Sequence, residues 1–374
     1  MSGIYIHIPF CKQACTYCNF HFSTQLKHKA DIVNAILGEI DLKESGWNEQ
    51  YFESIYFGGG TPSLLETNEL EAILHHLNHK FRIAPNAEIT LEANPDDINS
   101  ISVMEWKSLG INRLSIGIQS LSEAELKFMN RSHTASQSLM AINTAINSGI
   151  TNISIDLIFG SHLKNHEQWK SELEWAFNSG ASHLSAYGLT VEDKTKLAHD
   201  VATKNIPDVS DTHQSEQFEI LSKMANKSGW DFYEISNLCK PGHRALHNSN
   251  YWENKPYLGL GPSAHSYLHP VRSWNVANNA EYINKIGSGT LSQTSETLTP
   301  KDMVNELILT RLRRIEGLDI SHIEANFPDW QKSHAININK FKKNGWLTVQ
   351  NNFIILSTEG RLMADHISSE FMIE

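Results

Sequence analysis

The sequence predicts an α/β protein: a partial (βα)6 barrel of the TIM type, followed by a small C-terminal α+β module that is winged-helix-like. Short apolar, β-branched runs alternate with longer stretches of helical period, which is the pattern of successive βα units on a parallel sheet. The chain has 374 residues, 40% of them hydrophobic, so it can bury a large core divided among two or three domains.

Six βα units follow one another in the first half of the chain. The strand candidates are residues 4–8, 54–57, 87–93, 113–118, 153–159 and 183–187. The helical patterns between them cover residues 29–43, 66–79, 102–110, 135–149 and 166–180. Glycine follows several of these helical stretches directly, as the C-terminus of a helix prefers. We assign residues 1–200 to the barrel.

The pattern becomes less regular after the barrel. Residues 201–298 are expected to complete the core, with a helix near 212–228, a strand over 230–236 and an irregular stretch over 247–266. Residues 299–374 contain a long amphipathic stretch, then a helix, a glycine turn, two short strands around an Asn-Asn turn and a closing helix. This last segment holds 9 Lys and Arg against 10 Asp and Glu, so its shape does not indicate DNA binding, and we expect a docking or lid role.

Composition and charge narrow the class of protein. The formal net charge of −11 argues against a nucleic-acid partner, because binding nucleic acid needs a basic surface. The sequence has no run of eighteen apolar residues, and its first ten residues lack the features of a secretory signal. We therefore expect a cytoplasmic protein, where a tight cysteine cluster is more often metal-binding or redox-active than disulfide-bonded.

Chemistry in a parallel βα sheet collects at the carboxyl ends of the strands. The conspicuous polar and glycine-rich groups of the sequence all fall at this end of the predicted strands. They are Cys11, Cys15 and Cys18 after the first strand, Gly58, Gly59, Gly60 and Thr61 after the second, Glu92 and Asn94 at the third, Gln119 at the fourth, Asp156 on the fifth and Tyr187 on the sixth.

Three of the four cysteines lie within eight positions, with the spacing Cys-x3-Cys-x2-Cys. A structural zinc site needs four protein ligands, and the available candidates for the fourth are His7, His21 and the distant Cys239. An iron–sulfur cube needs one ligand per iron, so three thiolates would leave one iron open to bind another molecule. We prefer the cube and keep a zinc-stabilised scaffold as a weaker alternative.

The cysteine spacing after the first strand resembles the signature of the radical S-adenosylmethionine (SAM) proteins. In that family a [4Fe–4S] cluster binds SAM at its open iron, and an electron from the cluster cleaves SAM to a radical. The resemblance extends to one branch, the oxygen-independent coproporphyrinogen III oxidase family, and it covers the chain from about residue 3 onward. It implies SAM contacts for Tyr5, Tyr17, Gly58, Gly59, Gly60, Thr61, Glu92, Gln119, Arg131, Asp156, Thr190 and His265.

Two members of that branch must be separated, the true oxidase and a related heme chaperone. The oxidase has a further cysteine where this chain has Phe20, and it carries an N-terminal extension. The stretch HNSNYW, residues 247–252, matches the His-Asn-x-x-Tyr-Trp motif of the heme chaperones. An imidazole is a ready axial ligand for heme iron, and aromatic side chains pack against the macrocycle. We therefore expect heme to bind at His247, Tyr251 and Trp252, with His243 and His265 as competing ligands.

The resemblance implies a heme chaperone that holds a [4Fe–4S] cluster, SAM and heme, and that delivers heme to a membrane respiratory protein. It implies an electron donor such as a flavodoxin or ferredoxin, a peripheral position at the inner membrane through partners, and compatibility with a homodimer. Whether SAM is cleaved in function is left open. The alternative of a different class is an enzyme, the oxygen-independent coproporphyrinogen III oxidase or dehydrogenase of porphyrin biosynthesis.

Overall fold

The computed structural model describes residues 2–373 and confirms the predicted barrel-like sheet. Strands β1 to β6 are parallel and lie side by side in chain order. Their bounds are β1 Ser2–Ile8, β2 Tyr51–Gly59, β3 Arg82–Ala93, β4 Arg113–Gln119, β5 Asn152–Phe159 and β6 His183–Gly188. The carboxyl ends of all six strands therefore share one end of the curved sheet, as the sequence predicts.

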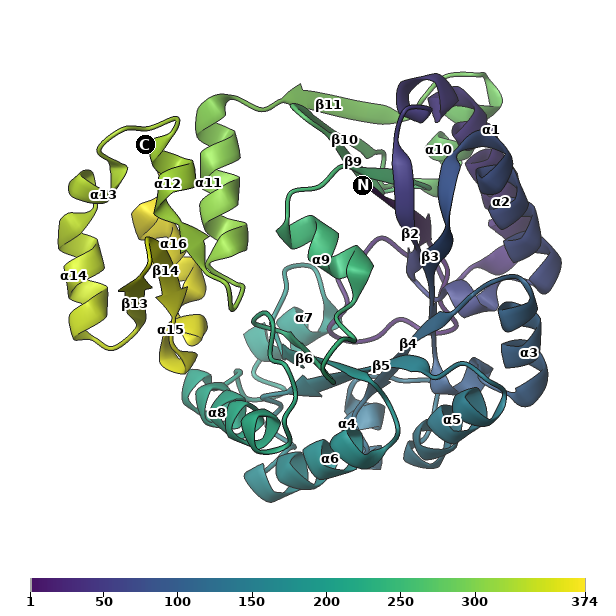
Figure 1. The fold of residues 1–374 in the computed structure, drawn as a ribbon. Helices are drawn as coiled ribbons and strands as arrows, with labels where there is room; N and C mark the ends of the chain where they lie inside the picture. Colours follow the sequence, from purple (N-terminus) through teal and green to yellow (C-terminus); the bar gives the residue numbers. More distant parts are fainter. Residues whose placement is uncertain (1, 374) are drawn as a thin grey trace.

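Helices cover the outer, convex face of this sheet (Figure 1). They are α1 Lys29–Trp47, α2 Thr67–Lys80, α3 Ser100–Ser108, α4 Glu123–Phe128, α5 Ala135–Asn147 and α6 His166–Asn178, with short 3-10 turns at Leu26–His28, Pro62–Leu64 and Pro95–Asp97. Asn99, Thr134 and Asn165 begin α3, α5 and α6 with capping boxes, which satisfy the first free N–H groups of each helix. Apolar side chains of strands and helices form one large core between the layers.

The sheet is larger than the sequence predicts. It has eleven strands, because β7 Asn237–Cys239 joins one edge and four strands join the other, namely β8 Tyr257–Leu260, β9 His265–Leu268, β10 Val271–Asn275 and β11 Gln293–Thr297. The helices of this part are α7 Lys196–Ala202, α8 Asp211–Lys227, α9 Leu246–Trp252 and α10 Asn279–Gly287. The helix expected near 212–228 is α8.

The strand expected over residues 230–236 is wrong. This segment makes only isolated bridges, from Asp231 to Cys239 and from Glu234 to Arg314. Its backbone is thus divided between β7 and the C-terminal module, and no continuous ladder forms although the residues are apolar enough for a strand.

The stretch expected to be irregular, residues 247–266, is also ordered into regular elements. It contains most of α9 and all of β8, and α9 lies inside the curve of the sheet (Figure 1). The carboxylate of Glu88 on β3 accepts the backbone N–H groups of Leu246 (3.2 Å) and His247 (3.1 Å), which fixes the start of α9. Because Glu88 and His247 are more than 150 positions apart, the sequence around residue 247 has no local pattern that predicts this helix start.

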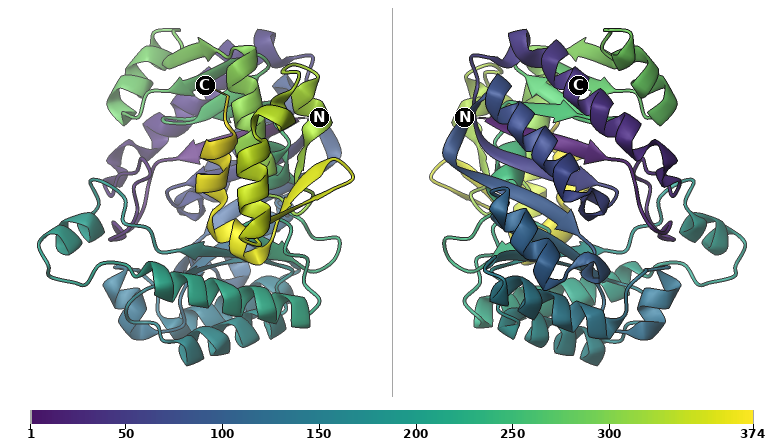
Figure 2. Two further views of the ribbon diagram at one scale, coloured as in Figure 1. Left: turned by 90° about the vertical axis from the view of Figure 1, so that its left-hand side faces the viewer. Right: turned by 90° about the vertical axis from the view of Figure 1, so that its right-hand side faces the viewer.

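The C-terminal module has a hydrophobic core of its own, which gathers buried residues between Val304 and Phe371. Its elements are α11 Pro300–Arg311, β12 Leu318–Asp319, α12 Ile320–Glu324, α13 Trp330–Ser333, α14 Ala335–Lys343, β13 Leu347–Gln350, β14 Phe353–Leu356, α15 Thr358–Leu362 and α16 Ala364–Phe371. Asn351 and Asn352, with φ of 47° and 70°, form the turn between β13 and β14. The module faces the viewer in the left panel of Figure 2. The domain limits at residues 200 and 298 stay predictions.

Among residues 2–373, no helix combines the length and the apolar character that crossing a membrane requires.

Candidate functional site

The three clustered cysteines lie in a loop that leaves β1 at its carboxyl end and returns to its own base. The N–H of Cys11 donates to the carbonyl of Ser23 (3.1 Å), and the N–H of Ser23 donates to the carbonyl of Pro9 (2.9 Å). Cys11, Cys15 and Cys18 are half-buried. The loop thus presents three thiols from one short, closed segment.

The glycine run at the end of β2 packs directly against this cysteine loop. A Cβ on Gly60 would lie 2.5 Å from the carbonyl oxygen of Phe10, and a Cβ on Gly59, whose φ is +105°, would lie 2.6 Å from the ring of His7. The N–H of Thr61 donates to the carbonyl of Phe10 over 2.6 Å. Gly59 and Gly60 are therefore needed by the packing of the protein itself, a role that the sequence does not distinguish from contact with a cofactor.

The side chains proposed as a fourth metal ligand are engaged elsewhere. Cys239 is fully buried on β7, where it pairs with His183 at the start of β6, at the opposite end of the sheet from the cysteine loop. His7 uses both ring nitrogens, Nδ1 with the Tyr5 hydroxyl (3.1 Å) and Nε2 with the His21 carbonyl (2.8 Å). The Nε2 of His21 lies 2.7 Å from the Asn279 side chain. Among the described residues, the loop therefore offers three cysteines, while each of the three candidates for a fourth ligand is hydrogen-bonded or buried far from the loop.

Arg131 joins the cysteine loop to the carboxyl end of β4. Its Nη1 donates to the sulfur of Cys15 (3.3 Å), and its Nη2 donates to Asn94 Oδ1 (2.6 Å) and to the carbonyl of Gly117 (2.8 Å). Its Nε is buried and has no hydrogen-bond partner among the residues that the structure describes. The guanidinium places a fixed positive charge beside the thiols, with one donor still available to a ligand.

Burial, with a smaller effect from the neighbouring Cys15 and Cys18, raises the pKa of the Cys11 thiol to about 11, although Thr61 and Arg131 act to lower it. Burial likewise raises the pKa of the Cys18 thiol. Without a metal these thiols are protonated at neutral pH, and a bound iron would remove their protons because a coordinating thiol is a thiolate. The donor set fits an iron–sulfur cluster.

Glu92 lies at the carboxyl end of β3, inside the curve of the sheet. The hydroxyl of Tyr56 donates to its Oε1 over 2.7 Å, and a Cβ on Gly58 would lie 3.1 Å from the same oxygen. Burial raises the pKa of Glu92 to about 7, an effect that the hydrogen bond from Tyr56 reduces and the charge of Asp156 increases. Burial also raises the pKa of Tyr5, which neighbours Glu92.

Two other predicted contacts face the same interior. Ser115 donates to the carboxylate of Asp156 at 3.4 Å, and burial raises the pKa of Asp156 to about 6. Gln119 ends β4 with a φ of 66°, a left-handed conformation that is uncommon for a residue with a side chain. A Cβ on Gly117 would lie 3.0 Å from Gln119 Nε2, so Gln119 and Arg131 share one side of the site.

The remaining predicted SAM residues are less closely gathered. Tyr17 packs against a small apolar cluster with Met129, Ile158 and Leu197. The loop that carries α7 reaches this side of the molecule, where the N–H of Leu197 donates to the carbonyl of Thr16 (2.8 Å). Thr190 is exposed and bonds only to the carbonyl of Gly188 among the described residues. His265, exposed on β9, stacks on Trp274 with ring centroids 6.1 Å apart.

The His247 motif lies toward the other end of the sheet. A Cβ on Gly3, at the start of β1, would lie 3.0 Å from His247 Nδ1. His247 is 2% exposed, and both ring nitrogens are engaged, Nδ1 with Ser54 (2.9 Å) and Nε2 with the Tyr251 hydroxyl (3.0 Å). Burial lowers the pKa of His247 to about 3, so the ring is neutral. In this conformation the imidazole makes two internal hydrogen bonds and offers no free nitrogen.

Tyr56 is the residue that the sequence analysis missed. Its ring stacks on His247 with centroids 5.0 Å apart, while its hydroxyl bonds to Glu92. Ser54, Tyr56 and Gly58 are two positions apart along β2 and so share one face of the strand, a period-2 pattern that could have placed Tyr56 on the inner face of the sheet.

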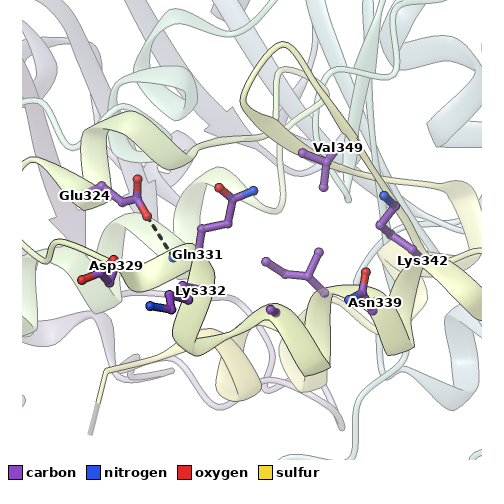
Figure 3. Close-up of a pocket in the computed structure, with 9 residues that line it drawn as sticks. Glu324, Asp329, Gln331, Lys332, Asn339, Lys342 and Val349 are labelled. Atoms are coloured by element: carbon purple, nitrogen blue, oxygen red, sulfur yellow. Dashed lines mark hydrogen bonds between the residues drawn. The ribbon is translucent and has the colours of Figure 1, made fainter.

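A separate pocket occurs in the C-terminal module, between α12, α13, α14 and β13 (Figure 3). Figure 3 shows Glu324 accepting the N–H of Gln331, at 3.1 Å, on one side of the pocket and Lys342 on the other. None of the site residues predicted from the sequence lines it.

Comparisons with known proteins agree with the architecture and extend it. The radical SAM superfamily profile matches residues 5–176, and the profile described as the HemN C-terminal domain matches residues 298–363. The solved coproporphyrinogen III oxidase of Escherichia coli, described as a radical SAM enzyme, superposes with a TM-score of 0.84 and 23% identity, over 99% of this chain and 90% of that one. That similarity shows the fold.

Relatives found by their sequence share more identical residues with this chain than the solved oxidase does. The chain is 30% identical to the heme chaperone HemW of Mycobacterium tuberculosis, over 98% of this chain and 93% of the relative. It is 28% identical to the heme chaperone HemW of Bacillus subtilis over the full length of both, and 31% identical to that of Escherichia coli over 85% of this chain and 79% of the relative. With three thiols in one closed loop at the carboxyl ends of a parallel sheet, and with this similarity along its length, the chain belongs to the heme chaperone HemW family of radical SAM proteins.

Proposed function

We propose that this protein is a radical-SAM-type heme chaperone that binds a [4Fe–4S] cluster, SAM and heme, and that delivers heme to a membrane respiratory protein. The observation that carries the proposal is the cysteine loop. It offers three thiols, and the histidines and the fourth cysteine that could complete a four-ligand zinc site are hydrogen-bonded or buried elsewhere.

Cys11, Cys15 and Cys18 would hold the cluster, and the iron without a protein ligand would be open to SAM. When bound, the cluster supplies an electron that SAM can accept. Arg131 offsets the negative charge of the thiolates and directs its remaining donor, Nε, into the same buried region. Glu92 is placed to accept hydrogen bonds from the hydroxyl or ammonium groups of SAM, and Asp156, Gln119, Tyr5 and Tyr17 surround the same interior.

Heme would bind at the α9 side of the barrel, through Nε2 of His247. Ligation requires that the Tyr251 hydroxyl leave Nε2, while Ser54 keeps its hydrogen bond to Nδ1 and fixes the ring. Trp252, the last residue of α9, is partly exposed, and the guanidinium of Arg313 lies 6.0 Å from its ring centroid. An arginine in this position can pair with a heme propionate, and the indole can pack on the macrocycle.

The cluster and the heme would thus occupy different ends of the same interior. Tyr56 contacts both regions, because its hydroxyl bonds to Glu92 and its ring stacks on His247. Binding of SAM at Glu92 would therefore change the packing around the heme ligand through one side chain. This arrangement supports a role for SAM in loading or releasing heme.

The partners follow from this role. The heme acceptor would be a membrane respiratory protein, the electron donor a flavodoxin or ferredoxin, and the chaperone would work in the cytoplasm and at the inner membrane through its acceptor. A homodimer is compatible with the proposal.

The proposal is tested by anaerobic reconstitution of the cluster, followed by heme titration with and without SAM. We expect saturable heme binding, whose affinity SAM changes, and loss of that binding in His247→Ala. His243→Ala is the matched control, because His243 is an exposed histidine four residues away and should not change the titration. An unchanged titration in His247→Ala would place the heme ligand elsewhere.

A second assay separates the chaperone from the oxidase. Phe20, at the position where the oxidase has its further cysteine, is 66% exposed beside the cluster loop. Reconstituted protein incubated with SAM, a reductant and coproporphyrinogen III should yield no protoporphyrinogen IX. Formation of that product would establish the enzyme in place of the chaperone.

A further inference from the structure

A second group of metal-ligating side chains lies outside the site described above, where α6 begins beside α8. His166 is the first residue of α6, and His213 and Glu216 lie one helical turn apart on α8. One nitrogen of each histidine and one oxygen of Glu216 all lie within 4.8 Å of one another. No step of the proposed heme chemistry uses these three residues.

His213 has a defined tautomer. Its Nε2 lies 2.8 Å from the carbonyl oxygen of Lys164, which can only accept, so Nε2 must carry the proton. The lone pair of the ring is therefore on Nδ1. A histidine that ligates a metal usually donates its other N–H to a carbonyl or carboxylate, which holds the ring and makes it a better ligand. His213 makes such a hydrogen bond, to the Lys164 carbonyl.

His166 also has a ring nitrogen without a hydrogen bond among the described residues, and this nitrogen lies near Glu216. Its Nε2 lies 3.3 Å from Glu216 Oε2, makes no hydrogen bond to any residue of 2–373 and is shielded from solvent. A shielded polar atom without a partner is uncommon in a native protein, and a bound ion is one of its ordinary explanations. The rings of His166 and His213 stack with centroids 5.0 Å apart and an angle of 13° between their planes.

We propose that His166, His213 and Glu216 form a binding site for a divalent transition-metal ion of the zinc class. Two imidazoles and one carboxylate are a ligand set that zinc uses with a water at the fourth position. Zinc–ligand bonds of ~2.0–2.1 Å put the ligand atoms of a tetrahedral site roughly 3.4 Å apart. Small rotations of the partly exposed side chains close the gap from the observed separations, and the exposed Glu216 leaves room for the water.

The ion would connect α8 to the first residue of α6, directly after the loop that follows β5. That loop already depends on α8, because Gln217 donates to the carbonyl of Lys164 (2.9 Å) and accepts the N–H of Gly160 (2.7 Å). His213 adds a third connection through its contact with the same carbonyl, so a metal bridge would be a further one. It would stabilise them without contact with the cysteine loop or with His247.

The test uses protein with its iron–sulfur cluster reconstituted, because empty thiols would themselves bind zinc. Equilibrium dialysis against buffered Zn2+, with the metal counted by mass spectrometry, should find one zinc per chain in addition to iron. His213→Gln and Glu216→Gln should each weaken this binding at least ~10-fold, since a lost ligand costs no less than a lost outer-shell partner. X-ray absorption at the zinc edge should report nitrogen and oxygen ligands and no sulfur.

His322→Gln is the control, because His322 is an exposed histidine on α12 and is not one of the three proposed zinc ligands. It should leave the zinc affinity unchanged. Two results would overturn the proposal: no zinc retained by the reconstituted wild-type protein, or equal zinc retention in the double variant His166→Gln/His213→Gln. The exposed pair His75 and His79 on α2 would then be examined as the source of any retained zinc, by the variant His75→Gln.

Discussion

The hydroxyl of Tyr56 donates a 2.7 Å hydrogen bond to the carboxylate of Glu92, and this bond holds a partly buried acid inside the barrel. Burial keeps the pKa of Glu92 near 7, well above its ordinary value of 4.5. The charged form is therefore disfavoured in the folded protein without ligand. A ligand that donates hydrogen bonds to this carboxylate would stabilise its charged form, so the site is suited to such a ligand.

Glu92→Gln should stabilise the empty protein at alkaline pH. The pKa of Glu92 is higher in the folded than in the unfolded chain, so its destabilising effect is full above pH 7 and disappears as the pH falls toward 4.5. We expect a gain of about 2 kcal/mol in the free energy of unfolding at pH 8, reduced from the full shift because Glu92 is partly accessible. Urea unfolding at pH 8 and pH 5 measures it. Glu71→Gln, on the exposed face of α2, should show no such difference.

Tyr251→Phe should strengthen heme binding. The substitution removes the hydroxyl that occupies Nε2 of His247 and keeps the aromatic ring. A hydrogen bond that no longer has to break is worth about 1 kcal/mol, so we expect an affinity about fivefold higher in a heme titration followed by absorbance. Tyr257→Phe, which removes the hydroxyl of the ring packed edge-on against Tyr251, is the control. Weaker binding in Tyr251→Phe would mean that the Tyr251 hydroxyl itself contacts heme.

Gly60→Ala should disrupt the cysteine loop. The new methyl group would lie 2.5 Å from the carbonyl oxygen of Phe10, directly before Cys11, so the loop must shift. We expect severalfold less iron per chain after reconstitution and a loss of about 1–3 kcal/mol in stability. Gly46→Ala is the control, since a Cβ there meets nothing within 4 Å. Full iron content in Gly60→Ala would show that the loop tolerates displacement.

Lys164→Met should destabilise the fold strongly. Lys164 is 1% exposed and bridges the buried carboxylates of Glu125 and Glu172, which Ser120 also joins. Removing the cation leaves two buried acids without their counterion, at a cost of about 3–5 kcal/mol. Chemical denaturation followed by circular dichroism measures this. Lys170→Met, which breaks only the exposed pair with Glu167, should cost less than about 0.5 kcal/mol.

The barrel could be predicted from sequence because each βα unit is specified locally. Its strands are short apolar runs, and α3, α5 and α6 begin at capping residues within a few positions of their apolar faces. The strands β8 to β11 could not be predicted in the same way. Tyr257 on β8 pairs with Gly3 on β1, so the register of β8 depends on a strand more than 250 positions earlier.

The features of the candidate site likewise separate into those that the sequence specifies locally and those that depend on contacts between distant segments. The sequence by itself determined the three-cysteine loop and the end of the sheet where Glu92 and Gln119 lie, since parallel strands align their carboxyl ends. Only the family resemblance assigned Arg131 to the site. Only the tertiary structure decided that His247 is buried with both nitrogens engaged, that Cys239 lies far from the loop, and that Tyr56 contacts both regions. These outcomes depend on hydrogen-bond partners such as Ser54 and Glu88, which come close only when distant segments pack together.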